Sequence, residues 1–274
     1  MKSNTLLKFG ALAFAALSLQ VQAGEVTASS KNVITTPIVE EDYVGGRGLL
    51  TMEGPTGLFI NPTSGTMPAG AFTAQYCFFL PNWSASDPLM AHGALISYGV
   101  TDWLEVGGLF SALDIDNGDD FISGGPMVRI RLLKQDGAMP ELSVGGYIFL
   151  GDKEEYTPFL ALFKSFEISK DGFLRSVGFH AGIRERFIEK GPFAPDASDA
   201  PVGYFGAELE LPFRIYLVGE VSTPDKDFSD STPYAFGIQW RLGGINISVA
   251  CADPGFPFVD EPSLFFGIGT QFSF

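Results

Sequence analysis

Two histidines, His92 and His180, are the side chains best suited to acid–base chemistry in this 274-residue sequence. Hydrolysis that uses a histidine base also needs a nucleophile and an orienting group placed around it. The residues that follow the two histidines are Gly-Ala and Ala-Gly, so neither position carries a His-x-Ser pattern. We therefore expect no enzyme activity and no cofactor, and we interpret His180 as a hydrogen-bonded filler of the protein interior.

The acidic run at 114–120, Asp-Ile-Asp-Asn-Gly-Asp-Asp, has the carboxylate density of a calcium-binding loop. It lacks the bidentate glutamate that ends an EF-hand loop. We expect a solvated acidic loop and no metal site. If a divalent cation does bind there, its candidate ligands are Asp114, Asp116, Asp119 and Asp120.

A third group of polar side chains lies at alternate positions between apolar neighbours, as Arg129 and Arg131 do around Ile130. The candidates for solute selectivity are Arg129, Arg131, Glu141, His180, Arg184, Glu208, Glu220 and Arg241, and Glu210, Gln239, Asn246 and Gln271 share their phase. Arginines that face glutamates across a passage would orient and select solutes. The same residues, paired with one another, would instead fill and close a narrow interior. The sequence leaves both interpretations open.

These side chains are positioned by short segments in which apolar residues recur at every second position. Such alternation is typical of strands with two different faces. It predicts twelve strands, at 70–80, 91–100, 103–113, 124–134, 141–150, 157–166, 174–184, 203–211, 214–223, 233–242, 245–251 and 263–274. Most have about 9–11 residues, the length that crosses a bilayer at a tilt.

The connections between the predicted strands alternate in length. Short turns are expected at 101–102, 135–140, 167–173, 212–213 and 243–244, and long loops at 81–90, 113–124, 151–156, 185–202, 222–232 and 252–262. This asymmetry is typical of bacterial outer-membrane barrels, in which lipid-facing charge is disfavoured and the polar phase faces inward. We therefore predict an all-β fold, a transmembrane antiparallel up-and-down β-barrel of about twelve strands over 70–274. A soluble sandwich or closed barrel is the alternative, but it would expose the large apolar residues to water.

Composition agrees with an apolar, acidic exported protein. The chain is 46% hydrophobic and has a formal net charge of −15, which excludes disorder and makes nucleic acid an unsuitable partner. Residues 1–23 contain Lys2, Lys8 and a short apolar run that ends at Val-Gln-Ala, the pattern of a secretory signal peptide. We expect 24–69 to form a periplasmic N-terminal segment that lies against the barrel mouth or enters the lumen.

Two motifs resemble known families. The last strand, with Phe266, Ile268, Phe272 and the terminal Phe274 on one face, resembles the C-terminal signal that the barrel-assembly machinery recognises. Residues 54–64, Gly-Pro-Thr-Gly-Leu-Phe-Ile-Asn-Pro-Thr-Ser, resemble the entry motif of YjbH-like outer-membrane proteins, although Ser64 stands where that family usually has alanine. The second resemblance implies a short single-barrel relative of proteins associated with exopolysaccharide production.

We expect the chain to be exported to the outer membrane of a Gram-negative-type bacterium. Its expected partners are outer-membrane lipid, lipopolysaccharide, the barrel-assembly machinery, and a polysaccharide or small solute. The leading hypothesis is a passive or export-associated channel, linked through the family resemblance to polysaccharide export. The alternative is a structural or surface-interaction protein with a closed lumen. Cys77 and Cys251 fall on opposite strand faces, so we expect no disulfide between them.

Overall fold

The computed structural model describes residues 49–52, 54–81, 90–114, 121–190, 201–224, 231–242, 244–255 and 262–273. They belong to one compact unit, Gly45–Phe274. The signal peptide expected at 1–23 and the first part of the expected periplasmic segment lie outside the described residues. Among the described residues, no helix is both long and apolar enough to cross a membrane.

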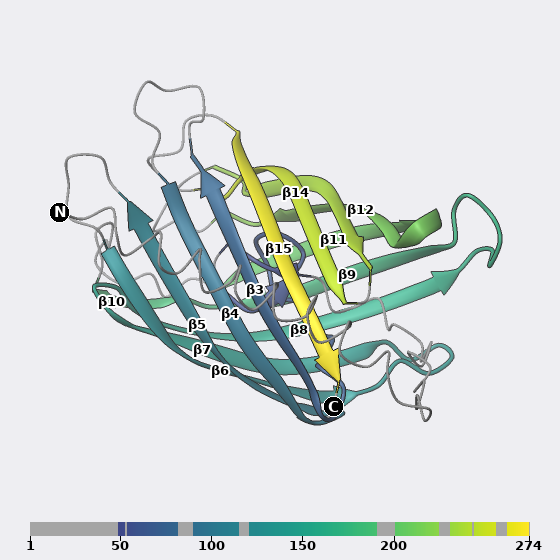
Figure 1. Cartoon of the computed structure of the whole chain (residues 1–274), viewed down its shortest axis with the longest axis horizontal. Coiled ribbons are helices and arrows are strands. Elements are labelled where there is room, and N and C mark those ends of the chain that lie inside the picture. Colours follow the sequence, from purple (N-terminus) through teal and green to yellow (C-terminus); the bar gives the residue numbers. More distant parts are fainter. Residues whose placement is uncertain are drawn as a thin grey trace, which may run out of the picture. The chain divides into compact units, whose positions relative to one another are not determined.

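The described strands form a closed antiparallel β-barrel (Figure 1). They are β3 (Ala71–Leu80), β4 (Met90–Thr101), β5 (Leu104–Asp114), β6 (Phe121–Leu133), β7 (Glu141–Gly151), β8 (Glu154–Glu167), β9 (Ser176–Arg184), β10 (Phe187–Lys190), β11 (Val202–Leu211), β12 (Ile215–Ser222), β13 (Tyr234–Arg241), β14 (Ile245–Asp253) and β15 (Ser263–Ser273). β15 pairs with β3, and pairing of β8 with β9 closes the ring. β9 and β10 both pair with β8 and follow each other along it, so they occupy one position in the ring. The thirteen strands therefore fill twelve positions.

The strand ranges agree closely with the alternation in the sequence. Strands predicted at 91–100 and 141–150 are observed at Met90–Thr101 and Glu141–Gly151. Two of the predicted long loops were wrong in part. The loop at 151–156 is reduced to Asp152-Lys153, because β7 ends at Gly151 and β8 begins at Glu154, and the loop at 185–202 contains β10, which pairs with the start of β8. The turn at 212–213 is confirmed as a tight turn, η2 (Pro212–Arg214), in which Phe213 and Arg214 have positive φ values of 62° and 57°.

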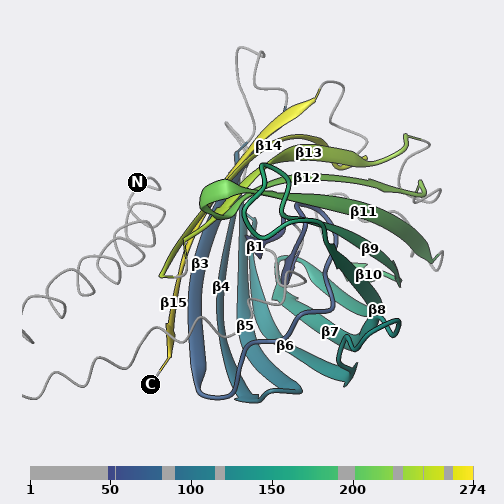
Figure 2. The same ribbon diagram turned by 90° about the vertical axis from the view of Figure 1, so that its right-hand side faces the viewer.

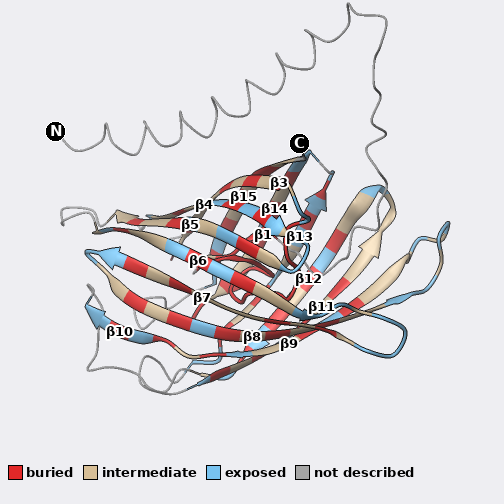
Figure 3. Cartoon of the chain, turned by 90° about the horizontal axis from the view of Figure 1, so that it is seen from below, coloured by how far each residue is buried: buried red, intermediate tan, exposed pale blue. Residues whose placement is uncertain are grey.

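The barrel wall is polar inside and apolar outside. On β13, Gln239 and Arg241 are 0% and 1% exposed, whereas the alternating Ile238 and Trp240 are 48% and 40% exposed. Buried bands alternate with more exposed ones along most strands (Figure 3). Since successive side chains of a strand point to opposite faces, one phase of every strand faces the lumen and the other faces outward.

The chain before β3 lies inside the ring. We call residues 49–67, which include β1 (Leu49–Leu50) and β2 (Thr56–Gly57), the lumen segment. β1 pairs with β2, and a bridge between Gly57 and Pro62 folds the segment back on itself. Seen along the barrel, β1 lies within the circle of strands (Figure 2). The described residues from 54 to 67 are all buried, so the segment is surrounded by the wall.

Candidate functional site

Glu220 on β12 binds the turn of the lumen segment at 58–61, which is closed by a hydrogen bond from the Leu58 N–H to the Asn61 carbonyl. Its Oε1 accepts backbone N–H groups of Phe59 and Ile60 at 2.6 and 2.7 Å. Its Oε2 accepts the backbone N–H and the side-chain Nδ2 of Asn61 at 3.2 and 2.8 Å. Asn61 Nδ2 also donates to Ser222 Oγ at 2.8 Å. One carboxylate therefore fixes three successive residues of the segment.

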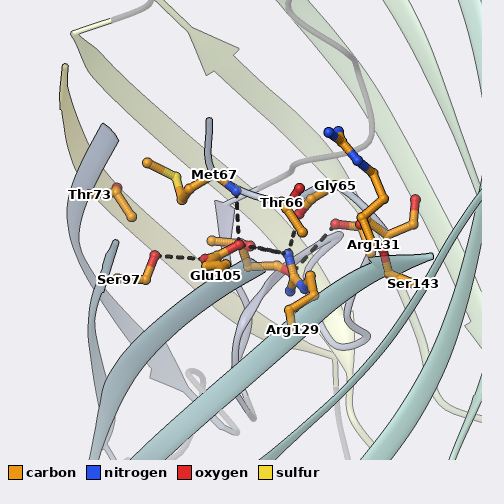
Figure 4. A network of polar contacts seen from close by, with 12 residues as sticks. Gly65, Thr66, Met67, Thr73, Ser97, Glu105, Arg129, Arg131 and Ser143 are labelled. Carbon is orange, nitrogen blue, oxygen red and sulfur yellow. Dashed lines mark hydrogen bonds and ion pairs between the residues drawn. The ribbon is translucent and has the colours of Figure 1, made fainter. Parts of the chain in front are cut away.

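Arg129 on β6 binds hydroxyl and carbonyl oxygens of the lumen segment. Its guanidinium donates to Thr56 Oγ1 at 2.9 Å, to the Thr56 carbonyl at 2.8 Å and to the Gly65 carbonyl at 2.5 Å. Glu105 on β5 lies beside it, with an oxygen 3.7 Å from Arg129 Nη1, and accepts the Met67 N–H at 3.1 Å. Ser97 completes the network by donating to Glu105 at 2.7 Å (Figure 4). Charge-assisted hydrogen bonds thus join wall and segment here.

Four further wall side chains bind the segment. Gln239 Nε2 donates to the Leu58 carbonyl at 2.7 Å, and Tyr204 Oη donates to the Pro62 carbonyl at 2.8 Å. Ser64 is held at both of its oxygens: its hydroxyl donates to Glu141 at 2.8 Å, and its carbonyl accepts from Ser143 Oγ at 2.5 Å.

The lumen segment spans the barrel from wall to wall. In the ring order β3-β4-β5-β6-β7-β8-β9-β11-β12-β13-β14-β15, β5 and β12 are six positions apart, as are β6 and β13. Glu105 and Glu220 therefore bind the segment from diametrically opposite strands, and so do Arg129 and Gln239. A segment that bonds to both sides of the ring crosses the passage.

Apolar side chains of the turn at 58–61 also pack against the wall. Leu58, Phe59 and Ile60 are buried, and the Phe59 ring meets Phe265 edge-on, with centroids 5.8 Å apart. Leu58 packs on Gly206 of β11, where an added Cβ would lie only 2.4 Å from Leu58 Cδ1. A glycine at this position leaves room for the segment against the wall.

Most buried wall carboxylates also have a cationic partner within the wall. Glu208 lies 2.8 Å from Arg241 Nη2 and 3.5 Å from His180 Nε2. The other pairs are Glu105 with Arg129 at 3.7 Å, Glu141 with Arg131 at 3.6 Å and Glu155 with Lys153 at 2.5 Å. All of these pairs lie within the wall, but Arg129, Glu105 and Glu141 also bind the segment, whereas Glu208 forms its pairs with Arg241 and His180.

The structure brings the predicted selectivity candidates to the inner phase of the wall. Buried among them are Arg129, Glu141, His180, Arg184, Glu208, Glu220 and Arg241, while the Arg131 side chain is 13% exposed. They lie on six strands of the ring, β6, β7, β9, β11, β12 and β13. Their role in selectivity stays a prediction. Sequence reasoning missed Glu105, Ser143 and Tyr204, although the alternation of Glu105 with Leu104 and Val106 was a usable signal.

The remaining predicted sites are divided between described and undescribed residues. Phe266, Ile268 and Phe272 share the outer phase of β15, and Phe274 lies outside the described residues. Asp114 ends β5, whereas Asp116, Asp119 and Asp120 lie outside the description. No group of metal-ligating side chains occurs among the residues that the structure describes.

The histidines and cysteines have simple surroundings. His180 stacks at a tilt on Phe163, with centroids 4.6 Å apart, and the Tyr76 hydroxyl lies 2.5 Å from His92 Nδ1. The prediction that the chain is not an enzyme is not tested by these contacts. Cys77 and Cys251 are both free thiols, in agreement with their opposite phases, and Cys77 Sγ lies 3.8 Å from the carbonyl oxygen of Thr51.

Comparisons with known proteins find structural similarity only. No family model matches the chain, so the resemblance to YjbH-like proteins is not supported, and no curated protein matches it. A solved KdgM porin is similar with a TM-score of 0.48 and 11% identity, covering 74% of this chain and 99% of that one. A NanC porin gives a TM-score of 0.45 and 13% identity, with 74% and 100% covered. At these values neither similarity assigns a function.

Proposed function

We propose that the protein is an outer-membrane β-barrel channel that the lumen segment holds closed. The observation that carries this proposal is the polarity of the wall, which is charged inside and apolar outside. Large apolar side chains are exposed on the outer phase of nearly every strand, as at Ile96, Phe205, Phe236 and Val249. An exposed apolar surface of this extent needs lipid around it, and a closed barrel satisfies its backbone hydrogen bonds without water.

The inner charges favour a passage over a permanently filled core. A pair of buried charges stabilises an interior no better than well-packed apolar residues do. Arg241 with Glu208 and Arg131 with Glu141 would, in contrast, remain paired and become hydrated when water replaces the lumen segment. A wall of this composition suits both states, one with the segment bound and one with water inside.

A second candidate function rests on the burial of the lumen. The segment contacts opposite walls, and Arg129, Gln239 and His180 are almost fully buried. A barrel whose segment never leaves would be a structural or surface protein with a sealed interior. The prediction of polysaccharide export was supported only by the resemblance to YjbH-like proteins, so it is not part of the proposal.

Single-channel recording in planar bilayers tests the choice between these functions. We expect the full chain to show rare openings, and the double variant Asn61→Ala, Ser64→Ala to open more often because it lacks side-chain hydrogen bonds to Glu220, Ser222 and Glu141. Ala69→Ser, at an exposed position next to the segment, is the matched control and should behave as the parent chain. Silence from all three, with heat-modifiable gel migration that proves folding, would favour the sealed barrel.

A further inference from the structure

Glu220 differs from the other buried carboxylates of the described strands. Glu105, Glu141, Glu155 and Glu208 each have an arginine, lysine or histidine nitrogen within 4 Å, and Glu220 has none from the part of the chain that the structure describes. Its hydrogen-bond donors come from Phe59, Ile60 and Asn61 of the lumen segment. When the segment leaves, Glu220 is the buried carboxylate that loses its donors without a cation to replace them.

The segment supplies hydrogen-bond donors to the Glu220 carboxylate but no positive charge. The bound groups are three backbone N–H groups and one amide side chain, all neutral. An ammonium or guanidinium group presents N–H donors in the same way and adds a positive charge, so its Coulombic attraction to the carboxylate adds to the hydrogen bonds. The turn at 59–61 therefore occupies a site whose chemistry suits an organic cation better.

Polar groups around Glu220 would remain available to such a cation. The hydroxyl of Ser222 accepts a hydrogen bond from Asn61 Nδ2, and the hydroxyl of Tyr204 binds the carbonyl of Pro62. Both belong to the wall and stay in place if the segment moves.

We propose that Glu220 is a binding site for organic cations with N–H donors, and that such a cation competes with the turn at 59–61 and releases the lumen segment. The proposal rests on the proposed function in one respect: release opens a passage only if the barrel is a channel. Displacement of the segment can be measured separately. Because a tethered segment competes at an effective concentration of about millimolar, we expect the response to a cation in the millimolar range.

The native Cys77 provides a direct reporter of displacement. Its thiol is buried beside Thr51 of the segment, so a water-soluble maleimide should react with it only when the segment moves. The experiment uses the full chain carrying Cys251→Ser, folded in detergent. The labelling rate is measured with 1,4-diaminobutane, with the neutral 1,4-butanediol of equal length, and with potassium chloride at matched ionic strength.

We expect the diamine to accelerate labelling about tenfold or more, the change produced by the loss of one charged hydrogen bond, and the diol and the salt to have little effect. Glu220→Gln should label rapidly without any addition and should not respond to the diamine. Asn61→Ala should label faster than the parent and still respond, since it keeps Glu220. Glu208→Gln, which removes an equally buried carboxylate that does not touch the segment, should respond as the parent does.

Equal acceleration by the diamine and the diol would overturn the proposal, and so would a Glu220→Gln protein that responds as the parent does. A response lost equally in Glu208→Gln would also overturn it, because the effect would then belong to the overall charge. If labelling responds as expected but bilayers stay silent, the cation site stands and the channel proposal fails. If the channel opens without any diamine effect, the channel stands and the cation site fails.

Discussion

The two walls that hold the lumen segment are built differently. The wall of β5–β7 binds the segment through side chains that are also paired with each other, as Arg129 is with Glu105. On the opposite wall, β11–β13, the roles are separated: Glu208 pairs with Arg241 and does not touch the segment, whereas Glu220 binds only the segment and Ser222 assists it. The ion pairs of the first wall do not require the segment, whereas Glu220 on the second wall takes its donors from it.

The largest expected effect is on the first wall. Arg129→Met removes three hydrogen bonds to the segment and leaves Glu105 buried without its cation. We expect a loss of about 3–5 kcal/mol in the free energy of unfolding, measured by urea titration with heat-modifiable gel migration. Adding Glu105→Gln should recover part of the loss. An Arg129→Met protein as stable as the parent would mean that this pair does not support the wall.

A second prediction compares the middle and the end of two neighbouring strands on the outer face of the barrel. Ile238→Arg places a charge near the middle of β13 on the outer phase, and if that face meets lipid it should cost about 2–4 kcal/mol in a bilayer, measured by folding into vesicles. Ile245→Arg, which is outward but at a strand end, should cost about 0–1 kcal/mol. Equal costs at the two positions would contradict a lipid-facing outer phase.

Arg241→Met tests the separation of roles on the second wall. It removes the 2.8 Å contact to Glu208 and the hydrogen bonds to Gln239 Oε1 at 3.0 and 2.6 Å, but leaves His180 beside that carboxylate. We expect a loss of about 1.5–3 kcal/mol in the free energy of unfolding, and a rise in the labelling rate of Cys77 no larger than that of Gln239→Ala, which removes the bond to the Leu58 carbonyl. A larger rise would show that the pair of Arg241 and Glu208 itself holds the segment, and the contrast between Glu208 and Glu220 would be lost.

The smallest expected effects come from the two serines that bind the segment. Ser143→Ala on the first wall and Ser222→Ala on the second each remove one hydrogen bond to it. Each should raise the Cys77 labelling rate about two- to tenfold, the effect of one neutral hydrogen bond. If the labelling rate rises in Ser143→Ala but not in Ser222→Ala, the segment is bound mainly by the β5–β7 wall.

The fold was largely predictable from the sequence because a strand with one polar and one apolar face has polar and apolar residues at alternate positions. The exception was β10, whose four residues are too few to show a period and which pairs with a strand more than twenty residues earlier. The inward phase of Arg129, Glu208 and Glu220 followed from the same rule.

The partners of those inward side chains could not be predicted. Phe59 and Glu220 are 161 positions apart, and nothing in either local pattern relates them. The entry motif at 54–64 indicated an ordered turn and left open whether it lay at the mouth or in the lumen. Which carboxylate would pair inside the wall and which with the segment depends on the register of distant strands.

The central claim is that the lumen segment closes the passage, and a reversible cross-link tests it most directly. Thr51→Cys with Cys251→Ser adds a second thiol on the residue whose carbonyl oxygen lies 3.8 Å from Cys77 Sγ, and mass spectrometry identifies the molecules in which the two thiols are joined. We predict no openings in planar bilayers after oxidation, and openings that return on reduction, with Thr51→Ser as the control. Conduction by the oxidised, mass-verified cross-linked protein at the level of the reduced protein, or silence in both states, would contradict the claim.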